Sequence, residues 1–291
     1  MRTIHRTRLP LTIAALALVT AVAAGSTAAS AGQTAVTQPV IKVSLTGSRM
    51  TVDGAKTWRP GAVRINAVTR APDQEVTLLR FRPGYSYARF IADGTRAHGR
   101  NAAAHAALRR LLAGTIYLGG VDIFPGQPAG FTITVHPGTY YLAQLNRRPN
   151  LIAIHVSGPA GTGAPSSGGL VTASDTGYRL DRQAFPAHGT ITVRNTGTQQ
   201  HRLSFVPIKR GTTRAQLGAY LRKTGASDNA PPPPFARKGP QLGTAAISPA
   251  QQMQLNYSLT PGEYALIDFG QDPSNGKPNS LEGLYTVETL R

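Results

Sequence analysis

The sequence predicts an all-β protein made of two tandem antiparallel β-sandwiches, each with a short helical insertion. Three observations support this fold class: short segments of alternating apolar and polar residues, turns of Gly, Pro, Asn and Asp between them, and a second half that repeats the landmarks of the first. Alternation gives each strand one buried and one solvated face, which is typical of antiparallel sandwiches. The 291 residues contain no Cys, so burial must stabilise the fold without disulfides.

Residues 1–31 have the features of a secretory signal peptide. Three arginines precede an apolar run from Leu11 to Ala24, and Ala29-Ser30-Ala31 fits the small-residue rule for cleavage. A membrane anchor is the alternative, but the run is too short to span a bilayer. We therefore expect a mature chain that begins at Gly32, has no transmembrane segment, and is secreted to the extracellular space or the cell envelope.

A low-complexity segment divides the rest of the chain. Ser157 to Gly169 (SGPAGTGAPSSGG) is almost entirely Gly, Ala, Ser, Pro and Thr, a composition that cannot bury apolar area and is typical of flexible connectors. We expect one domain over residues 32–156, a linker over residues 157–169 and a second domain over residues 170–291. Two domains of this length are of ordinary size.

The second half repeats the first. Four landmarks recur in the same order in both halves. The first is a Thr-Gly-x-Arg turn at 46–50 and 176–180, and the second is an aromatic residue with Pro and Gly before a strand, from Trp58 and from Phe185. The third is a further strand, from Glu75 and from His201, and the fourth is a strand pair with a Pro-Gly-x-Tyr turn, from Ile123 and from Ile247. Before the last landmark each half has a helical insertion, at residues 95–113 ahead of Gly114 and at residues 213–224. The shared order indicates a tandem repeat.

The two Pro-Gly-x-Tyr turns carry tyrosines at equivalent positions. Tyr140 and Tyr264 each follow such a turn at the start of an apolar strand. A tyrosine at such a corner buries its ring and uses its hydroxyl to hydrogen-bond the backbone. We expect both residues to act as corner tyrosines.

The stretch from Leu259 to Leu284 resembles the closing hairpin and ligand loop of a cupredoxin. In that family the fourth residue after the turn Tyr is the copper-binding Cys, and a loop with a His and an axial Met follows. Here those places hold Asp268, Asn279 and Leu284. His201, after an Asn-Thr-Gly turn, holds the place of the first copper-binding His. The resemblance implies two tandem Greek-key domains of the plastocyanin and azurin type.

The exchanged residues imply that type 1 copper is lost and that no cofactor replaces it. That site needs a thiolate, two imidazoles and a weak axial ligand, and the chain has no Cys. The resemblance implies that Asp268 lies beside His201, in a hydrogen-bonded pair that replaces the metal, at one pole of the second domain. A Cu(II) or hard-metal site from His201, Asp268 and Asn279 is the alternative. In the first domain Glu75 and Gln144 are expected to form the equivalent polar pair.

Motifs for catalysis are lacking in the sequence. It has no GxSxG elbow, HExxH helix or P-loop. It also has no HxH pair, which disfavours the multicopper oxidases and copper nitrite reductases that combine cupredoxin domains. His98 and His105 are seven residues apart on the expected helix, a spacing more typical of a solvated face than of a ligand pair. An enzyme is therefore disfavoured.

The chain is strongly basic. It has 31 Lys and Arg against 13 Asp and Glu, a formal charge of +18. The charges are scattered and come without a nucleic-acid-binding motif, so specific nucleic-acid binding is not indicated. Such a charge attracts a protein to anionic surfaces. We expect a partner that is an anionic cell-envelope polymer or another secreted protein.

One strand of the first half indicates where such a partner docks. The period of two places Leu79 and Phe81 on one face and Arg80 and Arg82 on the other, and Arg64 on the preceding strand has the parity to join the two arginines. A merely solvated arginine face is the alternative. These observations predict a secreted, non-enzymatic binding or envelope-associated protein built from two copper-less domains. The alternative function is a metal-handling or redox protein with another site around His201.

Overall fold

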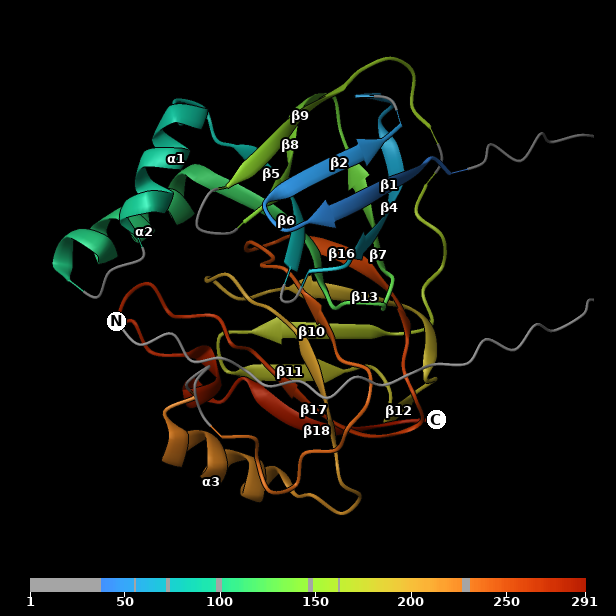
Figure 1. Ribbon diagram of the computed structural model, residues 1–291, viewed down its shortest axis with the longest axis vertical. Coiled ribbons are helices and arrows are strands. Elements are labelled where there is room, and N and C mark those ends of the chain that lie inside the picture. Colours follow the sequence, from blue (N-terminus) through green and yellow to red (C-terminus); the bar gives the residue numbers. More distant parts are fainter. Residues whose placement is uncertain are drawn as a thin grey trace, which may run out of the picture. The chain divides into compact units, whose positions relative to one another are not determined.

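The computed structural model describes most of the chain after the expected signal peptide, which lies outside the described residues. The described ranges are 38–54, 56–71, 74–97, 101–145, 149–161, 163–226 and 231–291. The residues that follow Ala35 form one compact unit (Figure 1). Within these ranges no helix has the length and apolarity needed to cross a membrane.

The first repeat contains nine strands in two sheets. One sheet has the order β2-β1-β4-β7 and the other the order β6-β5-β8-β9-β3. The bounds of these strands are β1 Val40–Thr46, β2 Arg49–Asp53, β3 Thr57–Trp58, β4 Gly61–Thr69, β5 Gln74–Phe81, β6 Thr115–Ile123, β7 Ala129–Val135, β8 Gly138–Gln144 and β9 Asn150–Val156.

The second repeat has the same strand order. Its sheets run β11-β10-β13-β16 and β15-β14-β17-β18-β12, which matches the first repeat strand for strand. The bounds are β10 Leu170–Ser174, β11 Gly177–Leu180, β12 Ala184–Phe185, β13 His188–Asn195, β14 Ser204–Ile208, β15 Leu242–Thr244, β16 Gln252–Ser258, β17 Gly262–Ile267 and β18 Tyr285–Leu290. The predicted fold class, two tandem Greek-key sandwiches, is confirmed.

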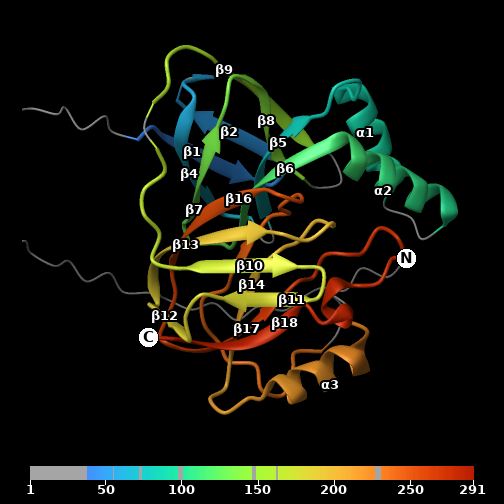
Figure 2. The same ribbon diagram turned by 180° about the vertical axis from the view of Figure 1, so that it is seen from behind.

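Both sheets continue from one repeat into the other. Strand β7 pairs with β16, with Phe131 opposite Leu255, and β6 pairs with β15, with Val121 opposite Thr244 (Figure 1; Figure 2). The result is one sheet of eight strands and one of ten. The domain boundaries that we expect from the sequence stay a prediction, and the two repeats share their sheets across them.

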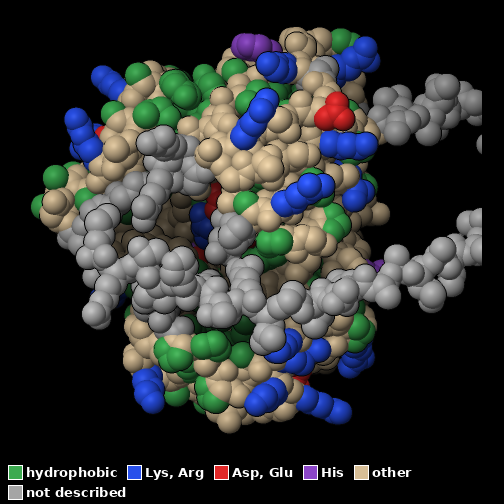
Figure 3. Space-filling view, in the orientation of Figure 1, with side chains coloured by type: hydrophobic (Ala, Val, Ile, Leu, Met, Phe, Trp, Pro, Cys, Tyr) green, Lys and Arg blue, Asp and Glu red, His purple; other side chains and the backbone are tan. Residues whose placement is uncertain are grey.

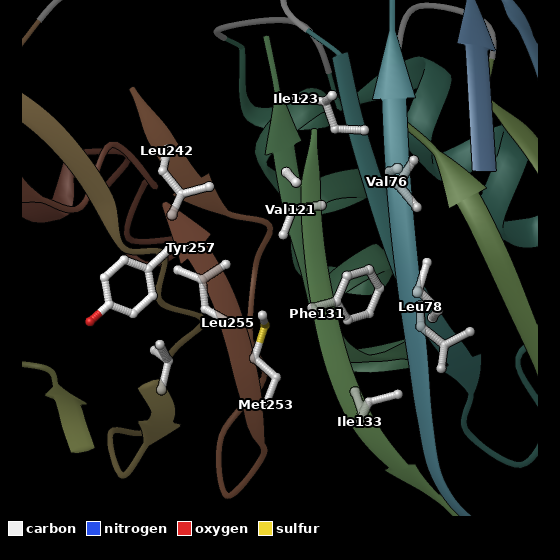
Figure 4. Packing of buried hydrophobic residues seen from close by; sticks show 14 of the residues in the cluster. Val76, Leu78, Val121, Ile123, Phe131, Ile133, Leu242, Met253, Leu255 and Tyr257 are labelled. Carbon is white, nitrogen blue, oxygen red and sulfur yellow. The ribbon is translucent and has the colours of Figure 1, made fainter. Parts of the chain in front are cut away.

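The hydrophobic core is continuous across this junction. Figure 4 shows Met253 and Leu255 of β16 beside Phe131 of β7 and Val121 of β6, and all four belong to one buried cluster. Leu255, Phe131 and Val121 have no exposed surface. Burial between the two sheets therefore stabilises both repeats together.

Close backbone approach at the junction depends on glycine. A Cβ atom on Gly120 would lie 2.1 Å from the carbonyl oxygen of Val76 and 2.9 Å from the Cβ of Ala245. Its counterpart in the second repeat, Gly243, would place a Cβ 2.2 Å from a carboxylate oxygen of Asp122. A side chain at Gly120 would push β6 away from β5, whereas one at Gly243 would displace the side chain of Asp122.

Each repeat carries the predicted helical insertion, although the first differs in detail. It consists of two helices, α1 Tyr87–Arg96 and α2 Ala102–Gly114, rather than one helix over 95–113. The break has a local cause, because Asn101 caps α2 by accepting a hydrogen bond from the amide of Ala104 at 2.9 Å. The second insertion is α3 Arg214–Thr224, which begins with a capping box.

The helices bury the outer faces of the ten-stranded sheet. Leu79 of β5 and Phe90 of α1 belong to a second buried cluster, and Phe81 packs on Phe90 and Tyr141 with ring centroids 5.3 and 4.6 Å apart. A third cluster joins α3 to β17 and β18. Strand β5 is therefore apolar on both faces in its middle, unlike the half-solvated strand that the sequence predicts.

Both corner tyrosines are confirmed. The hydroxyl of Tyr264 donates to the carbonyl of Thr260 at 2.9 Å, and that of Tyr140 accepts from the amide of His136 at 3.0 Å. Each partner lies four residues upstream, and both rings are buried.

Hydrogen bonds hold the connector segment against both repeats. The amide of Gly161 donates to the carbonyl of Pro60 at 2.6 Å, and that of Gly168 donates to Thr190 at 2.6 Å. The carbonyl of Pro165 accepts from the side chain of Gln254. The connector therefore lies along the sandwiches rather than acting as a free tether.

Candidate functional site

His201 lies just before β14, and both of its ring nitrogens are engaged. Nδ1 is 2.9 Å from Oδ2 of Asp268, and Nε2 is 3.0 Å from Oδ1 of Asp175. The backbone of His201 exchanges two hydrogen bonds with Ile247, which fix its position. The residue is only 2% exposed.

Asp268 directly follows β17 and has no exposed surface. Besides His201, its carboxylate accepts hydrogen bonds from the side-chain amide of Asn279 at 3.0 Å, the amide of Gly270 at 2.7 Å and the amide of Arg202 at 3.3 Å. Four donors thus converge on one buried carboxylate. Such saturation is the usual condition for keeping a charge away from water.

The loop between β17 and β18 adds the other two residues that the sequence predicts for this site. Asn279 begins the 3-10 turn Asn279–Glu282, and Leu284 follows it, with the two residues 1% exposed each. The amide of Asp268 donates to the carbonyl of Leu284 at 3.0 Å, and that of Leu284 donates to Asn279 at 3.2 Å. The structure therefore brings His201, Asp268, Asn279 and Leu284 to one place.

Asp175 completes the site, and sequence reasoning missed it. It lies in the turn between β10 and β11, where its carboxylate accepts from the amide and hydroxyl of Thr198 at 2.9 and 2.8 Å and from the amide of Gln199 at 3.2 Å. A Cβ on Gly197 would lie 2.7 Å from Nε2 of His201. Only a glycine there lets the turn close over the imidazole.

The hydrogen bonds favour a protonated His201. Between two ionised carboxylates, which only accept hydrogen bonds, an imidazole that contacts both donates from both nitrogens and is an imidazolium. Burial lowers the pKa of His201, but the hydrogen bonds and charges of Asp268 and then Asp175 outweigh it and raise the pKa above its ordinary 6.5. Burial raises the pKa of Asp175, but hydrogen bonds from Thr198, His201 and Gln199 outweigh it and lower the pKa to about 2.

This donor set does not fit type 1 copper. At the places that the resemblance assigns to the thiolate and the axial ligand, Asp268 offers only oxygen and Leu284 no donor, and an imidazolium at His201 has no free lone pair. Among the described residues no group of three or more His, Cys, Asp or Glu side chains is arranged to hold a metal. Of the helix histidines, His98 lies outside the described residues, and His105 lies on α2.

The expected polar pair in the first repeat is wrong by one residue. The strand registers make Gln74 the counterpart of His201 and Gln144 the counterpart of Asp268. The side-chain amide of Gln144 donates to Oε1 of Gln74 at 2.5 Å, while Glu75 points to another partner. A shift of one residue along a strand moves a side chain to the opposite face, which is why Glu75 cannot reach Gln144.

Glu75 instead forms an ion pair between the repeats. Its Oε2 lies 2.8 Å from Nη2 of Arg202, and Asp122 lies 3.9 Å from the same guanidinium. Glu75 and Arg202 are counterparts by the same register, so equivalent positions carry opposite charges and meet across the junction. The charge of Glu75 raises the pKa of Arg202 above its ordinary value, although burial lowers it.

The expected arginine face does not form as a unit. Arg80 lies at the end of β5 in the ten-stranded sheet and Arg82 directly follows that strand, but Arg64 lies on β4 in the other sheet, where its Nε donates to Asn66 at 3.1 Å. Successive strands of a sandwich often cross to the opposite sheet, and strand parity alone does not reveal this. Arg82 is exposed, and Arg80 is half-buried.

Comparison with known proteins gives structural matches alone. No family model matches the chain, and no curated protein matches its sequence. Reduced auracyanin from Roseiflexus castenholzii matches at 17% identity over 42% of this chain and 94% of that chain, with a TM-score of 0.26. Copper nitrite reductase from Nitrosomonas europaea matches at 10% identity over 88% and 94%, with a TM-score of 0.24, and the multicopper oxidase Fet3p at 9% over 87% and 65%, with a TM-score of 0.22.

The identical strand order of the two repeats shows one Greek-key sandwich repeated in tandem. The type 1 copper ligand set is lost, because the chain has no Cys.

The free energy of unfolding is expected to fall as the pH rises through the folded-state pKa of His201. Folding raises this pKa, so the contribution of His201 is fully present below pH 6.5 and is lost above the folded-state value. Denaturant titrations from about pH 6 to about pH 10 on the wild type and His201→Gln measure the difference. Parallel curves for the two proteins would show that His201 carries no such proton.

At acid pH the free energy of unfolding is expected to change with pH in the opposite direction. Folding lowers the pKa of Asp175 from 3.8 to about 2, so its contribution is present above pH 3.8 and is lost as the pH falls toward 2. Asp175→Asn should therefore flatten the acid limb of the same stability curve. An unchanged limb would contradict the assignment.

Proposed function

We propose that this chain is a secreted, non-enzymatic binding protein of the cell envelope that uses a cupredoxin-like scaffold without type 1 copper. The observation that carries the proposal is His201, held as an imidazolium between Asp268 and Asp175. Both ring nitrogens of His201 are hydrogen-bonded at the position where cupredoxins bind copper. We therefore infer that the protein acts through its surface and not through a metal at this site.

The charge of the surface supports an anionic partner. From Gly32 onward 28 basic residues stand against 13 acidic ones, an excess of 15, and the face in Figure 3 carries many Lys and Arg side chains and few acidic ones, spread over both repeats. A spread of this kind attracts polyanions over long range and does not depend on one contact. We infer that the partner is an anionic polymer of the envelope.

Binding to such a polymer can be measured with the chain from Gly32 onward. Sedimentation with insoluble anionic envelope polymer, with a neutral polysaccharide as control, is expected to show association at low salt. The affinity should fall about ten-fold or more between roughly 50 and 500 mM salt, because salt screens exposed charges. Equal binding to the neutral polymer, or none to the anionic one at low salt, would overturn the proposal.

A further inference from the structure

A pocket of about 760 Å³ lies beside the helical insertion of the first repeat. The turn after β5, the C-terminal half of α1 and the end of α2 form its walls. Its lining includes four arginines, Arg82, Arg89, Arg96 and Arg110, against a single acid, Asp93. Three positive charges are therefore left without a compensating acid in the lining.

Two of these arginines are available to a ligand. The side chain of Arg110 is committed, since its Nε and Nη2 lie 3.0 and 2.7 Å from Oδ1 of Asp93. Arg89 donates to the carbonyl of Gly84 at 3.2 Å through one of its nitrogens. Within the described ranges the side chains of Arg82 and Arg96 form no ion pair and donate no hydrogen bond.

The wall behind the arginines is built and rigid. Asp93 is 6% exposed and also accepts a hydrogen bond from the hydroxyl of Tyr85 at 3.1 Å. The Tyr85 ring lies so close to α2 that a Cβ on Gly114 would be 2.3 Å from it. Tyr85 is further fixed by an edge contact with Phe81, with centroids 5.9 Å apart. Packing and hydrogen bonding therefore fix this wall of the pocket.

We propose that this pocket binds a phosphate-bearing segment of the anionic polymer, an inference that rests on the proposed binding function and names its specific site. Guanidinium groups bind phosphate oxygens through paired hydrogen bonds, and Arg82, Arg89 and Arg96 supply several such donors. The volume exceeds that of one phosphate and suits a phosphorylated polyol or sugar unit. Tyr85 and the small residues Ala92 and Ala113 offer the unit an apolar wall.

Calorimetric titration with a short poly(glycerol phosphate) chain tests the site. Arg82→Gln/Arg96→Gln is expected to weaken binding about ten-fold or more, since each charge-assisted contact carries a sizeable share of the affinity. The matched control is Arg49→Gln/Arg179→Gln, which removes the same charge from two exposed strand positions and should change the affinity less than about two-fold.

Further arms separate the possible results. Inorganic phosphate should bind at the same arginines but more weakly than the poly(glycerol phosphate) chain, and an oligogalacturonate of equal charge should also bind more weakly than that chain. Equal losses of affinity in the two double variants would overturn the proposal that this pocket is the binding site, and would leave the proposal of polymer binding by overall charge intact. Equal affinity for the oligogalacturonate would overturn the phosphate preference, and no binding by the wild type at low salt would overturn both the pocket and the proposed function.

Discussion

Replacing Asp268 with Ala is expected to lower the free energy of unfolding by about 4 kcal/mol. The carboxylate is completely buried and accepts hydrogen bonds from His201, Asn279, Gly270 and the amide of Arg202. Its removal leaves an imidazolium with one carboxylate and three other donors without an acceptor. Equilibrium unfolding in urea measures the loss.

A surface aspartate provides the control for this loss. Asp181 is exposed and forms only a loose pair with Arg182 at 3.5 Å, so Asp181→Ala should change stability by less than about 0.5 kcal/mol. A conservative Asp268→Asn retains shape and one acceptor and should fall between the two. A loss below about 1 kcal/mol for Asp268→Ala would mean that the network is not a structural centre.

Replacing Arg202 with Met is expected to cost about 3 kcal/mol. The guanidinium lies 2.8 Å from Glu75, whose side chain is only 12% exposed, and 3.9 Å from Asp122. Without Arg202 the largely buried carboxylate of Glu75 loses the cation with which it pairs. Because the pair joins the two repeats, the loss should appear as a single unfolding transition of the whole chain.

A double variant separates the ion pair from packing. Removing both charges with Glu75→Gln and Arg202→Met should recover most of the loss, since replacing both partners of a buried pair is far less costly than breaking it. Additive losses in the double variant would contradict a direct coupling between Glu75 and Arg202.

Local patterns account for what the sequence could predict. The Pro-Gly-x-Tyr turns, the helical insertion at residues 213–224 and the alternating strands are all encoded within a few residues, and each one forms in the structure. The position of Asp268 relative to Tyr264 also follows from one strand, because side chains four residues apart share a face.

Contacts between distant segments could not be predicted in the same way. Asp175 reaches His201 from a turn 26 residues upstream, and that turn carries no local sign of its partner. The pairing of β7 with β16 could not be predicted either, because neither strand carries a motif that specifies its partner. Glu75 was placed one residue out of register, and an error of one residue reverses the face of a side chain.

The choice of sheet escaped sequence reasoning for a related reason. Arg64 and Arg80 have matching parity on successive strands, but those strands lie in different sheets. The pocket arginines Arg89 and Arg96 lie on α1, and only the fold brings them to Arg82.

The central claim is that carboxylates, and not copper, hold His201. Calorimetric and visible-absorption titration of the chain from Gly32 onward with Cu(II), beside the same titration of His201→Gln, tests this claim most directly. We expect no intense blue band. We also expect the wild type to show no saturable heat of copper binding that disappears in His201→Gln. A blue band, or one copper bound per chain and lost in His201→Gln, would contradict the account.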